Sequence, residues 1–173
     1  MKKAFLGPMW SRKTFKILSE IRDKDYAIID CVNSRNSDRD LNNLADRNRI
    51  FSDIKYVPFI PETIVIDEVH LYQVLNKEEL IFSLLERDCD FILAGIYFDG
   101  YQNNRPFEIW NKIFPHMDEI FFLKSRVACG QCGSLKNVFY TKPKVIDAVE
   151  TEKIGDHYIN VCSACVEGGC PPF

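Results

Sequence analysis

The run from Gly7 to Thr14, with the sequence GPMWSRKT, has the residue types and spacing of a phosphate-binding loop. In the pattern G-x-x-x-x-G-K-[ST], backbone N–H groups surround phosphate oxygens, the lysine reaches the outer phosphates and the hydroxyl holds Mg²⁺. The run directly follows a short apolar segment and precedes a helix-like one, where the partial positive charge of a helix N-terminus adds to anion binding. The sequence therefore predicts that Lys13 and Thr14 serve the phosphates of ATP and Mg²⁺.

Arg12 is the one departure, because it stands where the pattern has its second glycine. If the backbone there has a positive φ, a non-glycine residue costs about 1–3 kcal/mol, which alone does not abolish binding. An arginine side chain in the path of the phosphate blocks the loop, whereas a guanidinium beside the phosphate attracts it. The sequence leaves both outcomes open.

Two carboxylates, Asp67 and Glu68, follow the apolar run 63–66 directly. In parallel α/β folds, ligands bind beyond the carboxyl ends of the strands. One acidic residue there can support the metal, and a second can accept a proton from an attacking hydroxyl. Alone, the pair reads as two solvated carboxylates at a strand end, and the phosphate loop upstream favours a functional role.

Two C-x-x-C pairs lie in the last third of the chain, and together they offer four thiolates to one tetrahedral Zn²⁺. A site with four thiolates has no open position, so this zinc is expected to stabilise the fold and not to catalyse. Cys31 and Cys89 lie in or beside apolar runs and are expected in the core, and Cys170 is assigned no role. The predicted zinc ligands are Cys129, Cys132, Cys162 and Cys165.

The elements that must position these groups alternate between apolar strands and helices. Strands are expected near 3–6, 26–32, 63–66, 90–96 and 118–123, with helices over 14–25 and 76–87 and with Asn76 as the cap of the second helix. The polar stretch 33–53 is expected to be mostly loop, with one short helix near 41–45. Continuous apolar strands alternating with helices predict an α/β fold, a parallel sheet with helices on both faces.

The character of the chain changes near residue 124, where cysteine pairs and glycines begin. We expect a P-loop nucleotide-binding domain over 1–123 and a small zinc-ribbon-like module over 124–173. With 173 residues, a net charge of −3 and an isoelectric point near 5.7, nucleic-acid binding is not favoured. No run is long and apolar enough for a membrane span, and the first strand leaves no room for a signal peptide, so a reducing, cytoplasmic setting is expected.

These motifs, taken in order, resemble the thymidine kinases of the cellular and viral type, which carry a zinc-bearing lasso. Residues 7–14 resemble the family's G-P-M-F-S-G-K-S/T, and 67–71 (DEVHL) its acidic signature D-E-x-Q-F. The run 95–101 followed by Arg105-Pro106-Phe107 resembles its G-L-x-x-D/T-F run with a basic-P-F end. Tyr140-Thr141-Lys142 matches its Y-T-K motif, and 154–162 its lasso pattern I-G-x-x-x-Y-x-x-V-C.

The resemblance implies a role for each matching position. Glu68 is the implied base that takes the proton of the nucleoside 5′-hydroxyl, and Thr14 and Asp67 are the implied Mg²⁺ residues. The residues implied for ATP are Gly7, Pro8, Met9, Ser11, Arg12, Lys13, Thr14, Arg35 and Asp67. Those implied for the nucleoside are Met9, Ile96, Tyr101, Arg105, Thr141 and Tyr158.

The implied activity is ATP-dependent phosphorylation of thymidine or a related deoxynucleoside by a homo-oligomer, commonly a tetramer in this family. The departures from the family pattern at Arg12, His70 and Leu71 and in the loop 97–104 all fall around the active site. A catalytically inactive relative that acts as a binding or structural subunit is therefore the alternative interpretation.

Overall fold

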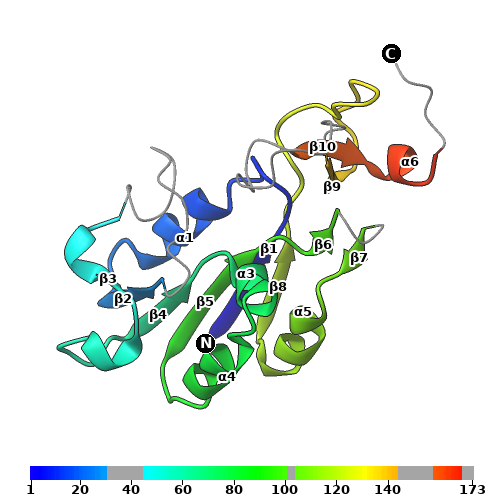
Figure 1. Ribbon diagram of the computed structural model, residues 1–173. Coiled ribbons are helices and arrows are strands. Elements are labelled where there is room, and N and C mark those ends of the chain that lie inside the picture. Colours follow the sequence, from blue (N-terminus) through cyan, green and yellow to red (C-terminus); the bar gives the residue numbers. More distant parts are fainter. Residues whose placement is uncertain (31–44, 101–103, 144–157, 169–173) are drawn as a thin grey trace, which may run out of the picture.

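A parallel sheet forms the centre of the molecule (Figure 1). The computed structural model describes residues 1–30, 45–100, 104–143 and 158–168. Its six-stranded sheet has the order β3-β2-β4-β5-β1-β8, and every pair of neighbours is parallel. The strands are β1 (Lys2–Leu6), β2 (Tyr26–Ile29), β3 (Ile50–Phe51), β4 (Thr63–Ile66), β5 (Asp90–Gly95) and β8 (Glu119–Phe122). The predicted α/β fold class is confirmed.

Helices cover both faces of the sheet, which is why its inner strands consist mostly of buried apolar residues. Along β1, Ala4 and Leu6 belong to the cluster under α3, α4 and α5, whereas Phe5 packs with Ile17 and Ile21 of α1. The helices are α1 (Lys13–Ile21), α3 (Val69–Val74), α4 (Glu78–Leu85) and α5 (Glu108–Ile113). Short 3₁₀ turns occupy Arg47–Arg49, Ile54–Tyr56 and Phe114–His116.

Two small hairpin-like units lie on the side of the sheet where β1 ends (Figure 1). One is the antiparallel pair β6 (Phe98–Asp99) and β7 (Arg105–Pro106). The other is the antiparallel pair β9 (Val138–Pro143) and β10 (Tyr158–Cys162), followed by the short helix α6 (Ser163–Val166). The second unit contains the second C-x-x-C pair, which starts at the end of β10.

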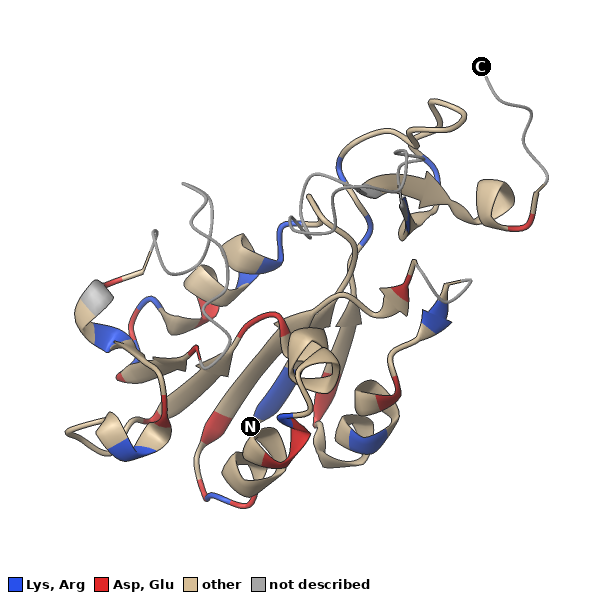
Figure 2. Ribbon diagram, viewed as in Figure 1, with Lys and Arg blue, Asp and Glu red and all other residues tan. Residues whose placement is uncertain are grey.

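Opposite charges meet where the strands begin (Figure 2). Lys3 of β1 contacts Glu20 of α1 at 2.9 Å and Glu119 of β8 at 3.5 Å. The hydrogen bond to Glu20 raises the pKa of Lys3. These contacts join α1 to the edge strand at the end of the sheet away from the predicted site.

The predicted cap of the second helix is wrong. Asn76 has a φ of 54° and donates its N–H to Gln73 O at 3.1 Å, so it ends α3 and does not start α4. Asparagine tolerates this left-handed conformation, which is common just past a helix C-terminus. The N-cap of α4 is instead Lys77, which makes no capping hydrogen bond with its side chain.

The structure also contains α3, α5 and β3, which the sequence patterns did not predict. Each has six residues or fewer, which is too short for a period of 3.6 or 2 to stand out. The expected short helix near 41–45 lies almost wholly outside the described residues. Among the described residues, no helix is both long and apolar enough to cross a bilayer.

Candidate active site

The predicted phosphate and acidic segments meet at one edge of the sheet, where the parallel strands end. Gly7 follows β1, Asp67 follows β4, and Ile96 follows β5, which lies between those two strands. Leu6 is in register with Gly95, and Gly7 N–H donates to Gly95 O at 3.2 Å. The sheet therefore fixes the phosphate loop beside the end of β5, with the acidic pair on the other side.

The predicted phosphate loop, residues 7–14, has a left-handed residue at the position where its pattern has the second glycine. Arg12 has φ 65° and ψ 28°, in the left-handed region, and its carbonyl accepts the N–H of Lys16 as α1 begins. Trp10 is also left-handed, with a φ of 61°. The loop thus contains two non-glycine residues in a conformation that costs about 1–3 kcal/mol each.

Gly7 permits a close approach that no other residue permits. A Cβ atom at this position would lie only 2.4 Å from the backbone oxygen of Leu123 and 2.8 Å from Ser11 Oγ. The end of β1 therefore packs closely against the chain that leaves β8.

The side chain of Lys13 folds back onto the predicted phosphate loop. Its Nζ donates to the carbonyls of Gly7 and Pro8, each at 3.0 Å, and lies 3.5 Å from the Oγ of the buried Ser11. The ammonium group is thus held at the loop backbone, next to the start of α1. This is the position from which a lysine can contact a phosphate that binds in the loop.

The acidic pair has a fixed backbone. Glu68 has φ 51° and ψ 40° as it enters α3, and its N–H donates to Asp67 Oδ1 at 2.8 Å. The Glu68 side chain is 24% exposed, and its Oε2 lies 3.5 Å from His70 Nδ1. The carboxylate is therefore partly exposed, with one of its oxygens near the His70 ring.

His70 connects the acidic pair to the end of β5. Its ring is buried, packs at 5.2 Å from the ring of Phe107, and accepts the N–H of Ile96 on Nδ1 at 3.2 Å. An accepting Nδ1 carries no hydrogen, so the neutral ring is protonated on Nε2. The carbonyl of Ile96 accepts the indole N–H of Trp110 at 2.8 Å, so both polar backbone groups of Ile96 are held by side chains.

The segment after Ile96 packs on the strand that contains Thr141. A Cβ atom on Gly100 lies 2.6 Å from Thr141 O, and the rings of Phe98 and Tyr140 are 4.4 Å apart. Thr141 is buried, whereas Arg105 is exposed in β7 opposite Asp99. The structure thus brings two segments of the expected nucleoside pocket together.

Three expected site residues lie wholly or partly outside the described part of the chain. Arg35 and Tyr101 lie outside the described residues. Tyr158 pairs through its backbone with Pro143 in the β9–β10 pair, and its side chain lies outside the described part. Cys31 and Cys170 are likewise outside it, and Cys89 is half-buried against the core, where burial raises its thiol pKa.

The four predicted zinc ligands form one cluster. The Sγ atoms of Cys129, Cys132, Cys162 and Cys165 lie within 4.8 Å of one another, and two of the pairs are 3.6 Å apart. A tetrahedron with Zn–S bonds of about 2.3 Å has sulfur atoms about 3.8 Å apart, so the cluster fits zinc.

The electrostatics of the cluster also favour a cation. Burial opposes ionisation of Cys129, but hydrogen bonds from the backbone at Cys162, Gln131 and Cys132 outweigh it and lower its pKa to about 6. Cys132 gains a backbone hydrogen bond from Ser134, but the thiols of Cys162 and Cys129 prevail and raise its pKa to about 11. Backbone hydrogen bonds therefore favour the thiolate of Cys129, which is the form of cysteine that binds a metal.

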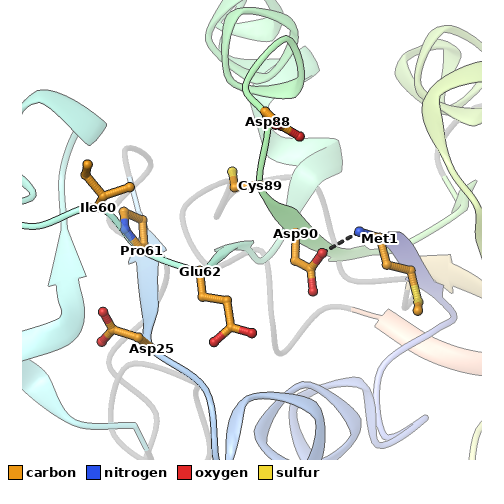
Figure 3. Close-up of a pocket in the computed structure, with 8 residues that line it drawn as sticks. All are labelled: Met1, Asp25, Ile60, Pro61, Glu62, Asp88, Cys89 and Asp90. Carbon is orange, nitrogen blue, oxygen red and sulfur yellow. Dashed lines mark hydrogen bonds and ion pairs between the residues drawn. The ribbon is translucent and has the colours of Figure 1, made fainter.

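A hollow of about 480 Å³ lies at the opposite edge of the sheet, where β5 begins (Figure 3). Its wall includes Asp25, Glu62, Asp88 and Asp90, and two of these carboxylates are already paired. Asp90 binds the N-terminal ammonium group and Lys24, and Asp25 binds Arg49. An acidic hollow with these pairings is a poor place for a phosphate, and it takes no part in the candidate site.

Sequence patterns missed several residues that hold the site, above all Asn160, Trp110 and Ser125. Asn160 lies between two apolar residues of β10 and therefore looks like a solvent-facing position, yet it is only 7% exposed. Its side chain reaches the carbonyl of Met9 in the phosphate loop. No spacing in the sequence predicts such a contact, because Asn160 and Met9 are far apart in the chain.

Comparison with known proteins places these features in one family. No curated protein sequence matches the chain closely enough to count as a relative. The sequence model of the thymidine kinase family matches residues 3–166, a span that includes the phosphate loop, the acidic pair and all four clustered cysteines. The chain therefore belongs to the thymidine kinase family.

Proposed function

We propose that this protein transfers the γ-phosphate of ATP to the 5′-hydroxyl of thymidine or a related deoxynucleoside. The observation that carries the proposal is the backbone of Arg12, which takes the left-handed turn that the missing glycine normally provides. This conformation supports a loop that can still surround a phosphate despite the substitution. Family membership supports the class of reaction, a kinase that acts on a deoxynucleoside.

The phosphate side of the reaction depends on the loop and on the first turn of α1. Backbone N–H groups and Lys13 would bind and orient the phosphates, with Gly7, Pro8, Met9, Ser11 and Arg12 forming the loop around them. Thr14 and Asp67 offer hydroxyl and carboxylate oxygens, the ligand types that suit Mg²⁺. When bound, this ion neutralises charge on the phosphate oxygens.

Glu68 would act as the general base. Its carboxylate is partly exposed beside the end of β5, and its backbone is fixed by Asp67. It would take the proton of the 5′-hydroxyl as that oxygen bonds to the γ-phosphorus and the bond to the β-phosphate oxygen breaks. Most of the remaining rate enhancement would come from positioning the two substrates.

The nucleoside would lie between the end of β5 and the β9–β10 unit. The supporting observation is that the segment after Ile96 packs against Thr141 at Gly100. Met9, Ile96 and Thr141 would contact the base, with Tyr101, Arg105 and Tyr158 from the surrounding loops.

The cysteine cluster would bind a structural Zn²⁺ that holds this unit. The family also supports a homo-oligomer, with a tetramer as the expected form, in the cytoplasm.

A second candidate function is a catalytically silent subunit of an assembly. The observation that favours it is the position of Lys13, whose ammonium group is bound by two loop carbonyls. If Arg12 also obstructs the loop, ATP does not displace these contacts. ATP binding that appears only in Arg12→Gly would support this reading.

A transfer assay separates the two candidates. The purified, zinc-loaded protein is incubated with labelled ATP, Mg²⁺ and thymidine, and the label in thymidine monophosphate is measured. Loss of a general base lowers the rate by about 10²–10⁴-fold, so Glu68→Gln is expected to remove nearly all transfer. Equal transfer by the wild-type protein and Glu68→Gln contradicts the assigned base, and no transfer by folded, zinc-containing protein contradicts the kinase proposal.

A further inference from the structure

Asn160 of β10 lies buried between the cysteine cluster and the phosphate loop. Its amide nitrogen donates to Met9 O at 2.9 Å and to Ser125 Oγ at 2.8 Å. Met9 belongs to the phosphate loop, and Ser125 belongs to the segment that leads from β8 toward the first cysteine pair. One side chain thus joins three parts of the chain that are distant in sequence.

The chemistry of this contact requires an amide. An asparagine NH₂ group carries two hydrogens, and both have an acceptor here. Met9 O accepts only, which fixes the amide with its nitrogen toward the loop. A carboxylate of the same shape places an oxygen against that carbonyl, so Asn160→Asp changes the sign of the interaction without changing the packing.

The contact supports a strained part of the loop. Trp10, the residue after Met9, has a φ of 61°, and its carbonyl accepts Arg126 N–H at 3.1 Å. Two consecutive loop carbonyls are therefore held by residues from the C-terminal part of the chain. Strained backbone persists only where its surroundings over-determine it, and these two bonds supply that support.

The same residue is anchored in the cysteine-bearing unit. Its carbonyl accepts the N–H of Gly130, the neighbour of Cys129, at 2.8 Å. Cys162 follows Asn160 by two residues in β10. The backbone of Asn160 is thus bonded to one cysteine pair and leads directly into the other, while its side chain holds the phosphate loop.

We propose that Asn160 is a positioning residue through which the metal-binding unit holds the phosphate loop in its nucleotide-binding shape. The unit then serves the ATP side of the site as well as the nucleoside side. The expected effect on MgATP affinity rests on the proposed kinase function. The structural coupling between Asn160 and the loop does not, because it requires no turnover.

The test compares Asn160→Ala and Asn160→Asp with Lys142→Ala as a matched control. Lys142 lies on the paired strand and donates to Cys165 O at 2.8 Å, so its loss perturbs the same unit without touching the loop. Acrylamide quenching of tryptophan fluorescence reports on the loop, because Trp10 is 51% exposed and Trp110 is fully buried. Zinc content and MgATP affinity are measured on the same full-length proteins.

The proposal predicts that both Asn160 variants keep one equivalent of zinc while quenching of Trp10 rises. The MgATP dissociation constant rises about fivefold in Asn160→Ala, as expected for one lost hydrogen bond, and further in Asn160→Asp. Lys142→Ala matches the wild type in both measurements. Adding Arg12→Gly to Asn160→Ala restores part of the affinity, because it relieves strain in the same loop.

Three results overturn the proposal. The first is unchanged quenching of Trp10 in both Asn160 variants, and the second is a change in quenching of equal size in Lys142→Ala. The third is loss of zinc from the Asn160 variants, because it would show that Asn160 stabilises its own unit. If the wild-type protein neither transfers phosphate nor binds MgATP, the kinase function fails separately. The quenching measurement still decides the coupling, because it requires neither.

Discussion

At the scale of single residues, Arg12 is the position at which this chain departs from the phosphate-loop pattern. Its left-handed backbone shows that this turn forms without glycine, the residue that adopts a positive φ most readily. The sequence identified this position as the departure from the pattern but could not give its φ, because the residue type alone does not fix the backbone conformation.

Replacing Arg12 with glycine is expected to stabilise the protein. The change relieves about 1–2 kcal/mol of left-handed strain, and the greater freedom of glycine in the unfolded chain offsets about 0.4–1 kcal/mol of that gain. Urea unfolding measures the difference. Arg22→Gly is the control, because Arg22 at the other end of α1 has an ordinary φ of −47° and glycine there should destabilise. Equal effects of the two changes contradict the strain argument.

Asp90 gives a pH-dependent prediction at the same scale. Hydrogen bonds from the N-terminal ammonium group and from Lys24 lower its pKa below the ordinary 3.8. A lowered folded-state pKa stabilises the fold above the unfolded value, and this contribution disappears as the pH falls through the lowered pKa. Because the side chain is 28% exposed, the effect is at most about 1 kcal/mol.

The expected result is that Asp90→Asn is less stable than the wild type at pH 7 and that the gap narrows below about pH 4. Urea midpoints at several pH values measure it, with Asp23→Asn as the control at an exposed carboxylate. A gap of constant size across this range argues against the ion pairs as its source.

At the scale of elements, the strands were predictable and several helices were not. Buried parallel strands consist mostly of apolar residues, so the runs that became β1, β4 and β5 stood out. The helix α3 begins directly after Glu68 and has only six residues, VHLYQV, in which no face is distinct. Asn76 read as a helix start because asparagine suits both a cap and a left-handed helix end.

Some candidate site residues were likewise predictable from the sequence and others were not. Motif residues such as Lys13, Asp67 and the four cysteines could be named from spacing, and the cysteines indeed cluster. Residues that position them, such as Asn160 and Trp110, could not be named, because their contacts form only when distant segments pack. His70 was noticed as a departure from the family pattern, and the structure gives it a contact, the N–H of Ile96.

That contact yields a prediction about the junction of α3 and β5. His70→Leu leaves the N–H of Ile96 without its acceptor, which is expected to cost about 1–3 kcal/mol. His70→Gln restores an acceptor oxygen and should retain most of the stability. Unfolding in urea distinguishes the two variants, and a leucine variant as stable as the glutamine variant shows that this hydrogen bond does not stabilise the junction.

At the scale of the whole molecule, side-chain contacts join the cysteine-bearing unit to the sheet domain and its candidate site. Phe98 and Gly100 contact β9, and Asn160 of β10 contacts the phosphate loop. Residues on the two sides of the boundary expected near residue 124 are therefore in contact. A metal that stabilises the smaller unit should stabilise the site as a whole.

Cys162→Ser tests this link. The variant is expected to lose both bound zinc and thermal stability, because metal binding contributes free energy of folding. Cys89→Ser is the control, since Cys89 lies outside the cluster and should leave zinc content unchanged. A full equivalent of zinc in Cys162→Ser contradicts the assigned ligands.

The proposed function requires that a phosphate loop without its second glycine still binds nucleotide. Titration of the zinc-loaded wild-type protein with MgATP, followed by calorimetry, tests it most directly, with Lys13→Ala as the matched variant. We expect saturable binding by the wild type and clearly weaker binding by Lys13→Ala, because Lys13 lies at the loop backbone. No binding by the folded wild type, or equal binding by the two proteins, contradicts the claim.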